Sequence, residues 1–233
     1  PVGLQNRMGA MFFTCALLGL TCMTSLEIFI SERAVFIAER ANQYYGSWAY
    51  YCSKVLFDIV PLRVIPPIIF GSISYFMIGL RYDGNIYYFL DYLLILVLFN
   101  VACGGITLTI ATISPSVALA NMVTLLLLFY FMLFGGFLLN NDNIPWYLAP
   151  LRFTSPFQFA LEAMLSNELT GQVIEVEVKN VGGLTKLPGD TVLINFGFNI
   201  KHYGLDWGML VGISAVFLVV PGILLHYFAK ERR

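Results

Sequence analysis

The sequence predicts an all-α integral membrane protein, a bundle of transmembrane helices with a small external α/β cap. The first observation is composition: 58% of the 233 residues are hydrophobic and 12% are charged, against about 45–50% and roughly 25% in soluble domains. The second is that the apolar residues form five runs, each near the ~20 residues that cross a bilayer as a helix. We therefore expect one integral domain over residues 1–233, cut from a longer protein.

Several classes of function are excluded by the same composition. The formal net charge of -1 and the absence of a basic stripe give no electrostatic case for nucleic acid. The four cysteines lie in or beside apolar runs, which favours packed thiols over disulfides or metal ligands. His202 and His226 are far apart, and no phosphate-binding glycine loop occurs. We expect no catalytic residues and no metal site in this chain.

The first two runs are joined by a charged elbow. Residues 8–30 form the first run, with Glu27 near its far end, and residues 55–80 form the second, which contains Arg63. Pro61, Pro66 and Pro67 should kink the second run, because each lacks a backbone donor. Residues 31–54 between them form the elbow, which carries two Glu-Arg pairs around an apolar centre. Either a helix lies along the inner membrane face here, or a helix end is merely solvated by its charges.

The later runs are residues 87–113, 117–139 and 207–228, and only a Ser-Pro-Ser turn separates the first two of these. Residues 140–206 form a loop too long to be an ordinary connection. Ser155 and Pro156 mark the start of a short interfacial or re-entrant helix. Residues 173–181 alternate as in a strand, glycine-rich turn chemistry follows, and residues 191–198 form a second extended piece. We expect a small folded cap here.

Basic residues in short loops set the orientation. Four crossings separate the elbow from the C-terminus, so both lie on one side, which carries most of the basic residues outside the long loop. By the positive-inside rule that side is cytosolic, and the cap at 140–206 is external or lumenal.

Two charges lie inside apolar runs at similar depth. Glu27 is about one turn, and Arg63 about two turns, from the inner membrane face. An intramembrane ion costs about 2.5–3.5 kcal/mol on insertion scales, so such groups usually face a partner. An interhelical pair or polar relay between Glu27 and Arg63 is one interpretation, and separate snorkelling of each side chain is the other.

Small and aromatic residues supply two more hypotheses. Gly204, Gly208 and Gly212 recur at the spacing that lets helices approach closely. Aromatic residues on the first and fourth runs could line an apolar cavity or face lipid; among them are Phe12, Phe13, Phe129 and Phe137.

Several motifs together resemble the transmembrane domain of G-subfamily ABC transporters. They are QNRMGAMFF at 5–13, ER-x-x-F-x-x-E at 32–39, VPLRVIPPIIFGSISYFMIGL at 60–80, FGGFLLN at 134–140 and NELTGQ at 167–172. They follow the family's order over nearly the whole chain. The pattern is similar to half-transporters of the white and breast cancer resistance protein type, and most like fungal members.

This resemblance implies a six-helix half-transporter, of which the chain matches the second to sixth helices. It implies an ATP-binding domain that holds ATP and Mg, and a second half in a homo- or heterodimer. The matching positions imply coupling to the ATP-binding domain at Glu32, Arg33, Phe36, Glu39 and Arg40, and an outward gate at Phe137 and Leu138. The substrate path would include Phe12, Phe13, Leu17, Leu20, Phe129 and Met132. Leu17 and Leu20 replace drug-contacting residues of the multidrug relative, so its specificity is not carried over.

The function hypothesis is the membrane part of an ATP-driven exporter for a lipophilic or amphipathic substrate, such as a lipid, sterol or xenobiotic. It would be a multi-pass protein of the plasma membrane or an organelle membrane of a eukaryote. The alternative is an ion-coupled carrier that uses Glu27 and Arg63.

Overall fold

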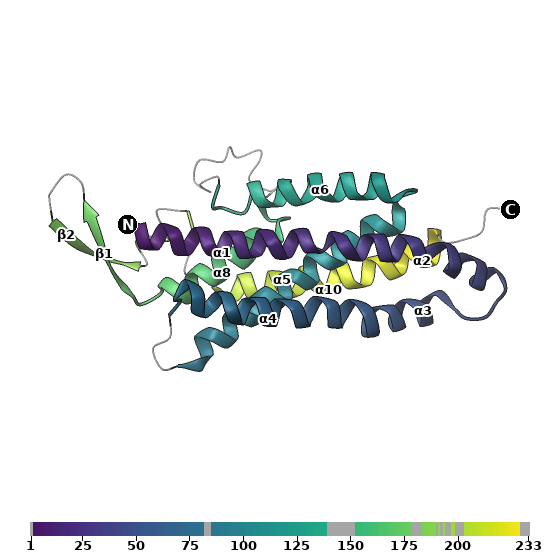
Figure 1. Cartoon of the computed structure of the whole chain (residues 1–233), viewed down its shortest axis with the longest axis horizontal. Coiled ribbons are helices and arrows are strands. Elements are labelled where there is room, and N and C mark those ends of the chain that lie inside the picture. Colours follow the sequence, from purple (N-terminus) through teal and green to yellow (C-terminus); the bar gives the residue numbers. More distant parts are fainter. Residues whose placement is uncertain are drawn as a thin grey trace.

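The computed structural model describes residues 2–81, 85–138, 152–178, 183–189, 191, 193, 197–198 and 203–228. Long helices run side by side along one axis (Figure 1). The start of the first helix and a β-hairpin lie at one end, which we call the hairpin end. The turn between the second and third helices lies at the opposite end, which we call the elbow end. Most of the described residues are helical, as the composition predicts.

The first two runs form a long helical hairpin. Helix α1 (Val2–Thr21) continues into α2 (Met23–Ala41) through a single irregular residue, Cys22. The apolar rod Gln5–Ala41 has 37 residues, or about 55 Å at 1.5 Å per residue, which exceeds a ~30 Å hydrocarbon layer. The elbow residues 32–40 continue this rod without a break, and their position along the inner membrane face remains a prediction.

The chain returns through α3 (Ser47–Lys54), a π-helical turn η1 (Val55–Ile59) and α4 (Val60–Ile78). Pro61 follows η1 and has no N–H to donate to the preceding turn. A wider turn next to this proline is consistent with that missing donor. Gly79, at φ 69°, then ends α4 in the left-handed conformation.

Helix α5 (Ile86–Ile113) is the centre of the bundle and packs against α10 (Tyr203–Phe228), α4, α8 (Pro156–Leu169) and α2. The side chain of Asn85 caps α5 by accepting from the Tyr87 amide at 3.2 Å. A Cβ added at Gly105 would lie 2.6 Å from the Phe217 carbonyl oxygen. Only glycine therefore lets α5 and α10 approach this closely.

Four helical stretches in the described part are long and apolar enough to cross a membrane: Gln5–Ala41, Ser47–Ile78, Ile86–Ile113 and Tyr203–Tyr227. The fifth predicted span is the shorter α6 (Val117–Leu133), which the side chain of Ser116 caps. The end of the predicted run, at residue 139, lies outside the described residues.

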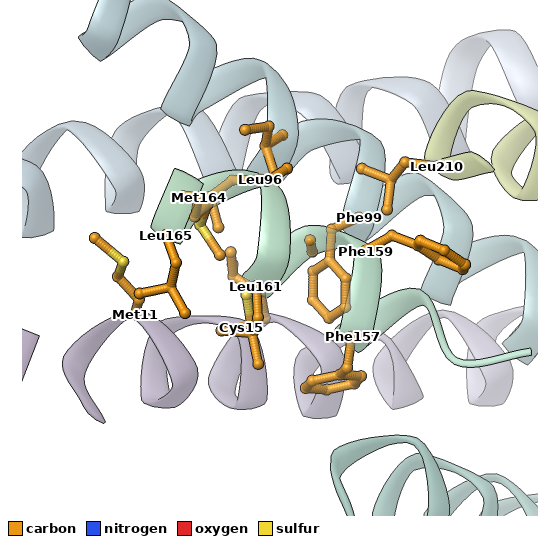
Figure 2. Close-up of a cluster of buried hydrophobic side chains, with 14 of the residues drawn as sticks. Met11, Cys15, Leu96, Phe99, Phe157, Phe159, Leu161, Met164, Leu165 and Leu210 are labelled. Atoms are coloured by element: carbon orange, nitrogen blue, oxygen red, sulfur yellow. The ribbon is translucent and has the colours of Figure 1, made fainter. Parts of the chain in front are cut away.

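The predicted α/β cap is not supported. Its helix is α8, whose side chains are almost all buried. Figure 2 shows residues of α8 such as Phe157, Leu161 and Met164 packed between α1 and α5. A helix that is apolar nearly all round belongs in a core, so α8 is part of the bundle.

The strands form a hairpin instead of a layer under that helix. Strand β1 (Val173–Val178) pairs antiparallel with β2 (Gly183–Pro188), with Glu175 opposite Lys186. The alternation predicted β1, but β2 occupies the segment that turn chemistry had assigned to a loop. The predicted extended piece at 191–198 lies largely outside the described residues.

Candidate functional site

The most buried cation of the membrane segments is Arg63, which is 3% exposed. Its Nη2 donates to the Cys22 carbonyl at 3.1 Å and to the Ser25 hydroxyl, and its Nη1 donates to Asn100 Oδ1 at 3.3 Å. These acceptors come from the α1–α2 junction and from α5, so Arg63 of α4 ties three segments together.

Gly104 makes room for this arginine. A Cβ at position 104 would lie 3.0 Å from both Cδ and Nε of Arg63. Two adjacent glycines of α5 thus allow two close contacts: Gly104 with Arg63 and Gly105 with α10.

A cavity of about 390 Å³ opens beside Arg63. Arg63, Asn100, Ser25 and two threonines give it polar groups, and the remaining walls are apolar; the lining residues are Leu17, Leu18, Thr21, Thr24, Ser25, Leu62, Arg63, Pro66, Phe70 and Asn100. A small number of fixed polar groups in an apolar cleft is typical of a site for a small amphipathic molecule. Leu17, a predicted path residue, lies in this cavity.

Glu27 does not share the surroundings of Arg63. It accepts a hydrogen bond from Asn121 Nδ2 of α6 at 3.2 Å and is exposed. The two charges therefore bind different partners in this conformation, and the polar relay between them remains a prediction.

The predicted path and gate residues divide into two groups. Phe12 and Phe137 stack with ring centroids 5.0 Å apart, which brings a path residue against a gate residue. Leu20 and Met132 are partly buried against the core. Phe13, Phe129 and Leu138 are 61%, 52% and 54% exposed, so they face away from the chain's own core.

The elbow charges turn toward the protein. Arg33 Nη1 donates to the carbonyl oxygens of Ala111, Thr112 and Ser114 at 3.0, 3.2 and 2.8 Å. Arg40 donates to the carbonyl oxygen of Leu225 at 3.4 Å and to that of His226 at 3.3 Å. The sequence had suggested that these arginines face a partner.

The remaining elbow residues join α2 to the returning chain. Glu32 pairs with Lys54 at the end of α3. The Tyr45 hydroxyl donates to Glu39, and this hydrogen bond, with a smaller contribution from burial, raises the pKa of Tyr45 to about 12. Phe36 is buried and stacks on Tyr50 at a centroid distance of 4.3 Å. The elbow is therefore internally braced.

Gly204, Gly208 and Gly212 do not lie at a close helix contact within the described part of the chain, and their role in helix packing remains a prediction. A Cβ at any of the three would meet nothing within 4 Å, and all three are exposed. The close helix approaches use other glycines, such as Gly105 against Phe217 and Gly222, where a Cβ would lie 2.7 Å from the Tyr51 ring.

Sequence reasoning missed Asn100, Lys54 and Glu168. Asn100 could have been found, because an amide in a 28-residue apolar helix marks a polar site. Glu168 accepts from Arg7 Nη1 and from the Arg81 amide, both at 2.8 Å, and it lay in a loop that was expected to be external.

Comparison with known proteins decides the family. The ABC-2 type transporter model matches residues 1–169. The chain belongs to the ABC-2 type transporter family. As a member of this family with several apolar helices, it is a multi-pass integral membrane protein. Metal-binding groups of three or more His, Cys, Asp or Glu are absent from its described residues.

Three relatives cover almost the entire ABC-2 chain. ABC transporter G family member 24 of Dictyostelium discoideum is 43% identical over 99% of the chain. A probable ATP-dependent permease of Saccharomyces cerevisiae is 34% identical over 99%. The broad substrate specificity ATP-binding cassette transporter ABCG2 of Rattus norvegicus is 28% identical over 99%. The chain spans 20%, 22% and 36% of their respective lengths.

Proposed function

We propose that this chain is the membrane-spanning part of an ATP-driven exporter that moves a lipophilic or amphipathic substrate across a plasma or organelle membrane of a eukaryote. The observation that carries the proposal is the cavity of about 390 Å³ beside Arg63 and Asn100 in an ABC-2 membrane domain. Its apolar walls suit a hydrocarbon body, and its few buried polar groups suit one polar end.

In this proposal the ATP-binding domain lies outside the chain and holds ATP and Mg, and a second half-transporter completes the path. The coupling elbow includes Glu32, Arg33, Glu39 and Arg40. The buried side chain of Phe36 stabilises its conformation. Phe12, Leu17, Leu20 and Met132 line the path on this half, while Phe13 and Phe129 are open to the second half. Phe137, stacked on Phe12, and Leu138 form the outward gate.

The ion-coupled carrier is the weaker candidate. A carrier of that kind needs Glu27 and Arg63 to exchange a proton or ion, and here each has its own neutral partners.

The test uses the full-length parent in lipid vesicles, with ATP hydrolysis measured with and without a panel of sterols, lipids and hydrophobic drugs. Stimulation by one class is expected. Leu17→Trp should fill the cavity and remove that stimulation, whereas Ile73→Trp, at an exposed position of α4, should not. Hydrolysis indifferent to every compound, together with uptake driven by an ion gradient, would favour the carrier.

A further inference from the structure

The two elbow arginines bind the ends of two other helices. The last four carbonyls of an α-helix have no intrahelical donor, and the helix dipole makes this end electronegative. Arg33 meets this end of α5 through Ala111, Thr112 and Ser114. Arg40 meets the last turn of α10 through Leu225 and His226. A charged guanidinium on bare carbonyls is a strong, directional contact.

The elbow is also braced by contacts of its own. Phe36 stacks with Tyr50 and Tyr45. The salt bridge between Glu32 and Lys54 joins α2 to α3. A force on the elbow would therefore move α2 and α3 together, with Arg33 and Arg40 attached.

The helices that these elbow contacts connect, α2 and α5, also line the cavity beside Arg63. Asn100, which binds Arg63, lies on α5 eleven residues before Ala111, or about 16 Å along the same helix. Cys22 and Ser25, the other acceptors of Arg63, lie on the rod that ends in the elbow. Two walls of the cavity are thus joined to each other at the elbow end by Arg33.

We propose that Arg33 and Arg40 are positioning residues that tie the elbow to α5 and α10, so that movement of the elbow displaces α2, α5 and α10 together. This inference rests on the proposed exporter function and deepens it. The arginines act inward, and the contact with an ATP-binding domain is left to other elbow positions. Those exposed positions include Val35, Ala38 and Tyr44.

The first experiment measures ATP hydrolysis and substrate transport in the same vesicles for the full-length parent. The double variant Arg33→Ala/Arg40→Ala is measured beside the wild type. Its transport per ATP should fall by about five- to tenfold, within the range typical of coupling between sites. Arg33→Lys keeps the charge and three N–H donors and should restore part of the coupling. Arg7→Ala, an arginine at the hairpin end, is the matched control and should leave the ratio unchanged.

The outcomes separate the two proposals. If the wild type neither hydrolyses ATP in response to any substrate nor transports, the exporter function fails. If the wild type transports and the folded double variant keeps its transport per ATP, the exporter stands and the inference is wrong.

A second measurement does not depend on the variants folding. Spin labels at Val35 and Ile113, exposed residues of the elbow and of the α5 end, report their separation in a Cys52→Ser background. The separation between Val35 and Ile113 should stay constant between the nucleotide-free and ATP-trapped states. A changing separation between Val35 and Ile113 would overturn the inference.

Discussion

The two ends of the bundle are both held by arginines, but with opposite kinds of acceptor. At the hairpin end, Arg7 and the Arg81 amide converge on the carboxylate of Glu168, whose side chain is 4% exposed. At the elbow end, Arg33 and Arg40 meet neutral carbonyls of helix termini. A carboxylate can lose its charge and a carbonyl cannot. The contacts of Glu168 at the hairpin end should therefore respond to pH.

The largest effect on stability should come from a change at the contact between α5 and α10. Gly105→Val would push a side chain into the Phe217 backbone, 2.6 Å away, between α5 and α10. Because backbone must move, we expect the free energy of unfolding to fall by about 3 kcal/mol, the upper part of the range for overpacking. Thermal unfolding in detergent measures it. Gly208→Val, where a Cβ meets nothing within 4 Å, is the control and should cost far less.

A smaller loss is expected from breaking the hairpin end alone. Glu168→Leu would leave the Arg81 amide without its acceptor, at a cost of about 1–3 kcal/mol. Glu168→Gln keeps an acceptor and should cost less. Equal stability of the leucine variant and the wild type would show that this carboxylate does not hold the hairpin end.

The pH response sharpens the comparison further. Burial raises the pKa of Glu168, while the Arg81 amide and Arg7 oppose that shift without cancelling it. The folded state then binds a proton more tightly than the unfolded state. The contribution of Glu168 to stability should rise as the pH falls from the raised pKa toward the ordinary carboxyl range. Unfolding scans across this window should show the slope in the wild type and lose it in Glu168→Gln; Glu32→Gln should keep it.

The smallest effect is expected at the elbow pair. Glu32 and Lys54 have side chains that are 44% and 9% exposed, so solvent screens one partner. Glu32→Gln should cost about 0.2–1 kcal/mol, as for other partly exposed pairs. A loss above this range, measured by the same unfolding scans, would mean that the elbow end is held by charge as strongly as the hairpin end.

Much of the architecture could be predicted from the sequence, because helix length and apolar runs are local properties. The runs around residues 8–30, 87–113 and 207–228 and the turn at 114–116 follow from them. The burial of α8 could not be predicted, since residues 156–169 are too short to be recognised as a span. The hydrogen-bond partners of individual side chains were harder to predict. Arg63 was recognised as an intramembrane charge, but its binding to Asn100 and the Cys22 carbonyl depends on how α2, α4 and α5 cross.

The partners of Arg63 have a consequence for how the protein is made. Two of its acceptors, the Cys22 carbonyl and the Ser25 hydroxyl, lie on the helix synthesised before it. Arg63 at the centre of a lone helix would oppose insertion by about 2.5–3.5 kcal/mol. The preceding helix can satisfy it as soon as the second helix emerges from the translocon. We expect α4 to enter the bilayer efficiently only as a pair with α1 and α2, which glycosylation mapping of truncated chains in microsomes would measure.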